Sequence, residues 1–377
     1  MVKRTALIGA IALLLGTVGC GTDRGGTSAG TGAGESESAK IFLAKAEQVA
    51  EAASGEIPLT VPTSGPPAVR DKTIVTIPCS AAAQGCKFAV DQFAEAAEAI
   101  GWKTVMIDPA GDPAKMADAV NRAVSMKADG IFTVAIDSST IQAPLTAAKE
   151  AGVEAICFSC IDEPGLLIDE LPAATQHEQD GYALAARAFI DSGGDMKAVL
   201  LQDSEFGNTI RRQQGIMKFI DECKAAGAHC ELVGQQNFLV QDISTSLPKQ
   251  TAALLRKNPD WNALFAPYDA PLTFLLPELR SAGLVRDGQR AYGFDPIDVN
   301  VKWIRDGDIE AGTVASPYKW IAYAGVDQLN RVFAGEQPAD QGVRDKLVIQ
   351  SNAPREGETY LGDSDPAAAF TSLWGVS

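Results

Sequence analysis

Histidine is the scarcest side chain in this 377-residue protein, which contains only His177 and His229. The Cys-x-x-Cys motif occurs once, at Cys157 and Cys160, so no second copy completes a zinc site of the usual spacing. No pair of carboxylates stands at a spacing that identifies a catalytic pair. We therefore expect no enzymatic activity, no catalytic residue, no metal and no cofactor. For Cys157 and Cys160, a thioredoxin-like redox pair and half of a metal site remain open alternatives.

Positive charge is also scarce, because 32 lysines and arginines face 48 aspartates and glutamates, for a net charge of −16. Nucleic-acid binding requires basic side chains that neutralise phosphates, so this balance argues against a nucleic-acid partner. After residue 20, no apolar run is long enough to span a bilayer. With 46% hydrophobic residues, the chain has the composition of a globular protein with room for two domains.

The first twenty residues have the composition of an export signal. Lys3 and Arg4 precede an apolar stretch at 6–15, which is too short for a transmembrane helix, and small residues lead to Cys20. This arrangement resembles the bacterial lipobox, in which the cysteine is acylated and becomes the first residue of the mature chain. We expect residues 1–20 to be a lipoprotein signal peptide with Cys20 as the lipidation site. Ordinary secretion is the alternative.

Residues 21–70 separate this signal from the regular part of the chain. Residues 21–38 are rich in glycine, serine and threonine, which is typical of a flexible tether. Residues 39–53 have helical spacing, and 54–70 contain four prolines. We expect 21–70 to be a flexible tether and an extended lead-in.

Six cysteines remain once Cys20 is assigned to lipid, and they occur in close pairs. In an exported chain this favours disulfides, and three local bridges are the simplest of 15 possible connectivities. The expected pairs are Cys79–Cys86, Cys157–Cys160 and Cys223–Cys230.

From residue 71 onward, strand patterns alternate with helix patterns. The expected strands are 72–78, 103–108, 130–136, 153–158, 196–201, 230–236, 263–267, 291–294 and 312–316. Amphipathic helices separate them, and such short β-α-β connections force parallel sheets. We predict an α/β fold of two doubly wound parallel-sheet lobes, in which ligands bind at the carboxyl ends of the strands.

Several local motifs occur in the order of a known family. They are DPAK at 112–115, MKADGIFTVAIDSSTI at 126–141, RRQQG at 211–215, ALFAPYD at 263–269, YGFD at 292–295 and AGTVAS at 311–316. Together they resemble the type I periplasmic binding proteins, in particular the ribose-binding-like proteins of sugar ABC transporters. The resemblance covers about 71–350. It implies two lobes joined by three crossings. A sugar-responsive repressor shares this fold, but the N-terminal segment of this chain has the pattern of an export signal and not of a helix-turn-helix.

The resemblance implies ligand-binding residues in the second lobe. Asp295 falls where the family carboxylate accepts hydrogen bonds from ligand hydroxyls, and Arg212 matches an arginine that donates to sugar oxygens. Tyr268 replaces the usual asparagine, and Ser316 replaces the usual glutamine near the hinge. The alternatives are a helix cap for Asp295, a surface salt bridge for Arg212 and core packing for Tyr268.

The family pattern differs more in the first lobe. Paired aromatic residues are replaced by the loop 79–88, where Gln84 and Phe88 are the candidate ligand residues. The usual Asp-Arg pair is replaced by Ser159 and Cys160, and Tyr318 is a candidate for replacement stacking, with helix-core packing as its alternative.

The resemblance also implies the domain boundaries and partners. The expected first lobe is 71–176 plus 317–345, and the second is 177–316 plus 346–377, with crossings near 174–178, 315–318 and 343–347. We expect a monomeric, extracytoplasmic lipoprotein that captures a small sugar or polyol and delivers it to an ABC permease, with only its lipid anchor in the membrane. A sensory receptor of the same fold and a binder of a small non-sugar metabolite are the alternatives.

Overall fold

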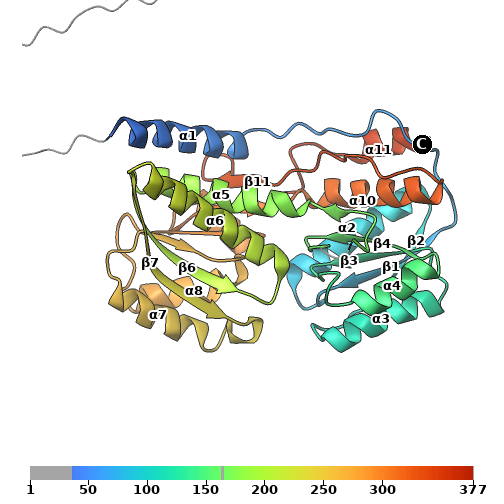
Figure 1. Ribbon diagram of the computed structural model, residues 1–377, viewed down its shortest axis with the longest axis horizontal. Coiled ribbons are helices and arrows are strands. Elements are labelled where there is room, and N and C mark those ends of the chain that lie inside the picture. The colour runs from blue at the N-terminus through green and yellow to red at the C-terminus, as the bar shows by residue number, and fades with distance from the viewer. Residues whose placement is uncertain (1–35, 163–164, 377) are drawn as a thin grey trace, which may run out of the picture. The chain divides into compact units, whose positions relative to one another are not determined.

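The computed structural model describes residues 36–162 and 165–376, and in them the first lobe is built on a parallel sheet (Figure 1). Its strands are β1 (Thr73–Pro78), β2 (Lys103–Met106), β3 (Gly130–Val134), β4 (Glu154–Phe158) and β5 (Glu170–Leu171), in the order β2-β1-β3-β4-β5. The helices of this lobe are α2 (Gln84–Ile100), α3 (Pro113–Ser125), α4 (Gln142–Glu150), α10 (Tyr318–Phe333) and α11 (Ala367–Leu373). One buried cluster lies between the sheet and α2 with α10, and another between the sheet and α3 with α4.

The second lobe contains a six-stranded sheet in the order β11-β10-β9-β8-β6-β7. Its strands are β6 (Asp195–Asp203), β7 (His229–Phe238), β8 (Ala263–Phe265), β9 (Arg290–Phe294), β10 (Glu310–Ala315) and β11 (Lys346–Ile349). Only β11 is antiparallel to its neighbour. The helical elements are α1 (Glu37–Ser54), α5 (Ala174–Asp191), α6 (Gly207–Ala225), the 3-10 turn η1 (Val240–Asp242), α7 (Leu247–Lys257), α8 (Ala270–Ser281) and α9 (Asp298–Arg305). These two sheets confirm the predicted doubly wound α/β fold.

Two glycines allow α5 and α6 to cross in backbone contact. A Cβ atom on Gly181 would lie 1.9 Å from the carbonyl oxygen of Arg212, and one on Gly215 would lie 1.9 Å from that of Glu178. Any larger residue would push the helices apart. This close crossing places Arg212 of α6 beside the first turns of α5.

The segment expected to be a flexible lead-in differs from that expectation over its described part. In α1, Phe42, Ala46 and Ala50 follow one another at four-residue intervals, so they share one helix face, and all three are buried in the core that α5 and α6 also form. Figure 1 shows α1 lying beside α5. The ring of Phe42 lies 5.0 Å from that of Phe219 and 5.7 Å from that of Phe189. The helix is therefore part of the second lobe. Residues 21–35, and the expected signal peptide with Cys20, lie outside the described residues.

The chain after α1 passes to the first lobe. Ile57 is buried in the core of that lobe, and its amide donates to Oδ2 of Asp363. Farther along, the Val69 amide donates to Oδ1 of Asn330 at 2.9 Å, and Nε1 of Trp102 donates to the Val69 carbonyl at 2.6 Å. Residues 57–69 thus form a packed strap, because their backbone groups are bonded to side chains of the lobe.

The expected assignment of 346–377 to the second lobe is wrong for its last helix. Although β11 pairs with β10 in the second sheet, Phe370 and Trp374 at α11 are buried in the core of the first lobe. The indole Nε1 of Trp374 donates to Oδ1 of Asp327 at 2.9 Å. Burial of these two aromatic side chains in that core stabilises this placement of α11. The connections after α1 and after β11 therefore join the two lobes in addition to the three expected crossings.

The structure joins the six described cysteines in the three expected pairs, Cys79–Cys86, Cys157–Cys160 and Cys223–Cys230. The first bridge closes the loop after β1, and the second flanks Ser159 at the end of β4. The third joins the end of α6 to the start of β7. Two of the three bridges thus restrain loops at the carboxyl edge of the first sheet.

Candidate functional site

The carboxyl ends of the strands in both lobes carry the candidate site. Three residues that directly follow strands have a left-handed backbone: Ala135 after β3 (φ 51°), Ser159 after β4 (φ 56°) and Asp295 after β9 (φ 56°). Non-glycine residues rarely adopt this conformation, and such strain concentrates at functional sites. The sharp turns point to a site built where these strands end.

Arg212 and Asp295 form the centre of the site in the second lobe. Nη1 of Arg212 donates to Oδ2 of Asp295 at 2.6 Å, and Nη2 donates to Oδ1 at 3.0 Å. The guanidinium also donates to the Pro267 carbonyl and lies 4.6 Å from the ring centroid of Phe294. The Arg212 side chain is 2% exposed, whereas that of Asp295 is 26% exposed. The pair therefore presents a fixed carboxylate that a ligand can reach.

Tyr268 is held by a neighbouring strand end. Its hydroxyl donates to Oδ2 of Asp203 at 2.7 Å. Burial raises the pKa of the Asp203 carboxyl, and the hydrogen bond from Tyr268 lowers it in part. Tyr268 packs near Phe238 with ring centroids 6.2 Å apart. Its side chain thus both closes the apolar core of this lobe and holds Asp203 at the edge of the site.

In the first lobe, Tyr318 lies between two aromatic rings. Its ring centroid is 5.1 Å from that of Phe88 and 5.4 Å from that of Phe158, both in edge-to-face geometry. Burial and the nearby Asp295 carboxylate raise the pKa of the Tyr318 hydroxyl. Gln84 is the exposed first residue of α2. The structure therefore brings Phe88 and Tyr318 together in the first lobe, and the charge of Asp295 in the second lobe acts on the Tyr318 hydroxyl.

Hydrogen bonds between described residues connect the lobes at this site. Nδ2 of Asn208 donates to Oγ of Ser159 at 2.8 Å, and the amide of Gly207 donates to Oδ2 of Asp137 at 2.8 Å. Ser159 was a candidate ligand residue, whereas Asn208 and Asp137 were not. Two sequence signals mark them: a polar turn shortly after β3 contains Asp137, and Asn208 lies one helical turn before Arg212.

Ser316 is buried in the crossing after β10, beside Asp345 of the third crossing. Its side chain lowers the pKa of Asp345, which burial raises to about 6. Ser316 thus lies in the crossing between the lobes, beside a carboxyl group that the sequence had not singled out.

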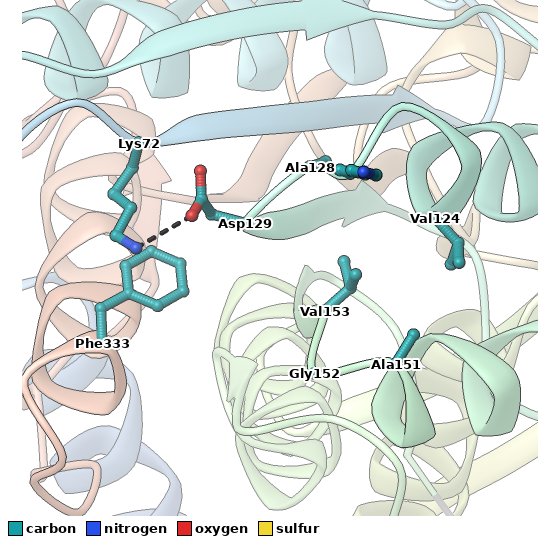
Figure 2. Close-up of a pocket in the computed structure, with 9 residues that line it drawn as sticks. Lys72, Val124, Ala128, Asp129, Ala151, Gly152, Val153 and Phe333 are labelled. Carbon is teal, nitrogen blue, oxygen red and sulfur yellow. Dashed lines mark hydrogen bonds and ion pairs between the residues drawn. The ribbon is translucent and has the colours of Figure 1, made fainter.

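A separate pocket of about 420 Å³ lies at the opposite edge of the first sheet (Figure 2). Lys72, Asp129 and Val153 line it, and they directly precede β1, β3 and β4. Nζ of Lys72 lies 2.9 Å from Oδ1 of Asp129 and 4.8 Å from the ring centroid of Phe333. Because open α/β sheets bind ligands at the carboxyl ends of strands, this pocket is not the candidate site.

Comparison with known proteins agrees with this architecture. Residues 74–337 match the model of a periplasmic binding protein domain. No curated protein matches the chain. Among solved structures, an ABC sugar transporter subunit from Rhodobacter sphaeroides is 18% identical, with a TM-score of 0.64, over 74% of this chain and 99% of that one.

Two further solved structures carry bound ligands. An ABC transporter solute-binding protein from Agrobacterium vitis with bound allitol is 16% identical, with a TM-score of 0.65, over 75% of this chain and 97% of that one. One from Mycobacterium smegmatis with bound glycerol is 17% identical, with a TM-score of 0.65, over 78% of this chain and 99% of that one. Identities this low show a shared fold. The family model, however, spans well over half of the sequence, and the chain therefore belongs to the periplasmic binding protein domain family.

Proposed function

We propose that this protein is an extracytoplasmic solute-binding lipoprotein of an ABC importer, which captures a small sugar or polyol between its lobes and delivers it to the permease. Membership of the periplasmic binding protein family supports the binding role. The solved proteins of this fold that carry allitol or glycerol support a polyhydroxylated ligand.

The observation that carries the proposal is the Arg212–Asp295 pair. A carboxylate offers several acceptor positions, and the bidentate guanidinium holds both of its oxygens in place. Because Asp295 stays partly exposed, its remaining lone pairs are available to two adjacent hydroxyl groups. A sugar or polyol presents such adjacent hydroxyls, so this pair selects for that chemistry.

Capture would use the contacts between the lobes. The bonds from Asn208 to Ser159 and from Gly207 to Asp137 join residues of α6 to strand ends of the first lobe. A ligand that contacts both lobes binds this arrangement better than a separated one, and so shifts the population toward it. That difference is the signal that a permease would read.

Anchoring rests on the leader sequence. Acylation of Cys20 would hold the protein at the outer face of the membrane by lipid alone. No helix within residues 36–162 and 165–376 is long and apolar enough to cross a bilayer. Because α1 starts at Glu37 and packs on the second lobe, the tether between lipid and protein would be the short segment 21–36.

The test is isothermal titration calorimetry with a panel of sugars and polyols after a thermal-shift screen. A ligand at 100 times its Kd stabilises the protein by about 2.7 kcal/mol, which the screen detects. Asp295→Asn should weaken binding of the best ligand by more than tenfold, whereas Asp298→Asn, an exposed residue in the next helix, should leave it unchanged. The proposal would be contradicted if no carbohydrate stabilised the protein, or if Asp295→Asn bound the best ligand as tightly as Asp298→Asn.

A further inference from the structure

A buried polar cluster lies where the crossings between the lobes meet. His177 and Asp180 are in the first two turns of α5, and Asp345 directly precedes β11 in the third crossing. One ligating atom from each of the three side chains lies within 4.8 Å of the others. The three residues are 0%, 4% and 5% exposed, respectively. With only two histidines and one Cys-x-x-Cys motif, the sequence indicated no metal site, and nothing in it places Asp345 beside α5.

His177 has an unsatisfied imidazole in this cluster. Within the described residues, neither Nδ1 nor Nε2 has a hydrogen-bond partner, and Oδ2 of Asp180 also has none. The His177 side chain is 0% exposed, so solvent does not reach either ring nitrogen. Buried polar groups are rarely left unpaired in folded proteins, which indicates that another group completes this cluster.

The charges around the cluster are unbalanced. The nearby cation is Arg212, and its Nη1 and Nη2 atoms both already donate hydrogen bonds to Asp295. If all three carboxyl groups are counted as ionised, Asp180, Asp345 and Asp295 carry two more formal negative charges than Arg212 offsets. A proton shared between Asp180 and Asp345 would remove one of these charges and would leave the imidazole unsatisfied. A divalent cation would remove both charges and would use the imidazole nitrogen.

We propose that His177, Asp180 and Asp345 bind a divalent transition-metal ion, with Zn²⁺ or Mn²⁺ as the chemistry that fits. One nitrogen and two carboxylate ligands suit these ions better than Ca²⁺, which takes six to eight oxygens. His177 and Asp180 are three residues apart on one helix face, so α5 presents both ligands together. The ion would join the start of α5 to the third crossing and restrain the hinge. The site does not depend on which solute the protein carries.

The experiment uses the full chain, purified without a polyhistidine tag and treated with a chelator. Calorimetric titration with Zn²⁺ and with Mn²⁺ should reveal one site per chain with a Kd in the micromolar range or tighter. His177→Gln should weaken that affinity at least tenfold. His229→Gln is the matched control, because His229 is the other histidine and is exposed on β7; this variant should bind like the wild type.

Asp345→Asn serves as a second variant, in case His177→Gln does not fold, and circular dichroism establishes which variants are folded. Co²⁺ provides an independent readout on the wild type, because coordination by a nitrogen ligand changes its visible absorption, and Zn²⁺ should displace it. Absence of stoichiometric binding by the wild-type chain overturns the proposal. So does wild-type affinity in the folded variants of His177 or Asp345, or loss of binding in His229→Gln alone.

Discussion

Replacement of Asp295 by Asn would test the central ion pair of the site without a ligand. The change keeps the shape of the side chain but removes its charge, and it leaves the guanidinium of Arg212 buried with only 2% exposure. Breaking a buried ion pair at one partner costs about 3–5 kcal/mol. Because Asp295 is 26% exposed and so partly solvated, we expect a smaller loss of about 2–3 kcal/mol in the free energy of unfolding.

Urea unfolding of the ligand-free protein measures this loss, with Asp306→Asn as the control. Asp306, the exposed residue directly after α9, pairs with Lys302 of that helix, so its replacement should not measurably change stability. If Asp295→Asn were as stable as the control, Asp180 and Asp345, which also attract Arg212, would compensate its charge, and the reasoning that Asp295 is its main partner would be wrong.

Three further predictions concern the packing around the site. Phe42→Ala should lower the unfolding free energy by about 3 kcal/mol or expose the amides of α1 to hydrogen exchange, because it removes a buried ring. Ile41→Ala is the control and should do neither, since Ile41 is 63% exposed. Equal exchange of α1 in the two variants would show that α1 is not docked. Removal of the Cys79–Cys86 bridge in a Cys79→Ala/Cys86→Ala variant should lower the free energy of unfolding in urea by roughly 2–3 kcal/mol relative to the oxidised wild type. An unchanged urea midpoint would refute a stabilising role of the bridge. Burial raises the pKa of Glu310 from 4.5 to about 7, so its contribution to stability is present at low pH and is lost as the pH rises through 7. Glu310→Gln should therefore reduce the decline of the unfolding free energy between pH 5 and 7.5, measured by urea unfolding. An unchanged decline would assign it to other groups.

The fold followed from local patterns. Strands such as 72–78 and 130–136 are short, β-branched and separated by amphipathic helices, and these properties act between neighbours in the sequence. Parallel pairing then follows from the short connections. The same reasoning missed the short strand β5 and the strand β11, because a two-residue strand and a four-residue edge strand have too little periodicity to detect.

Local sequence patterns could not predict how the two ends of the described chain pack. The spacing of apolar residues at 39–53 indicated a helix, but whether that helix is free or docked depends on a matching surface on α5 and α6. Likewise, Phe370 and Trp374 are a short apolar group whose partner lobe is set only by where the chain passes after β11. Burial depends on surfaces that are distant in sequence, so the sequence alone could not assign either segment.

For the site, the family resemblance identified Arg212 and Asp295 as candidate ligand residues, and the structure places them in contact across 83 positions of sequence. The sequence by itself determined the strand ends at which polar side chains would gather. Only the tertiary structure decided that Asn208 meets Ser159 and that His177 and Asp180 face Asp345. The physical reason is one of range: periodicity and turn chemistry act over a few residues, whereas these contacts depend on how the crossings bring distant segments of the chain together.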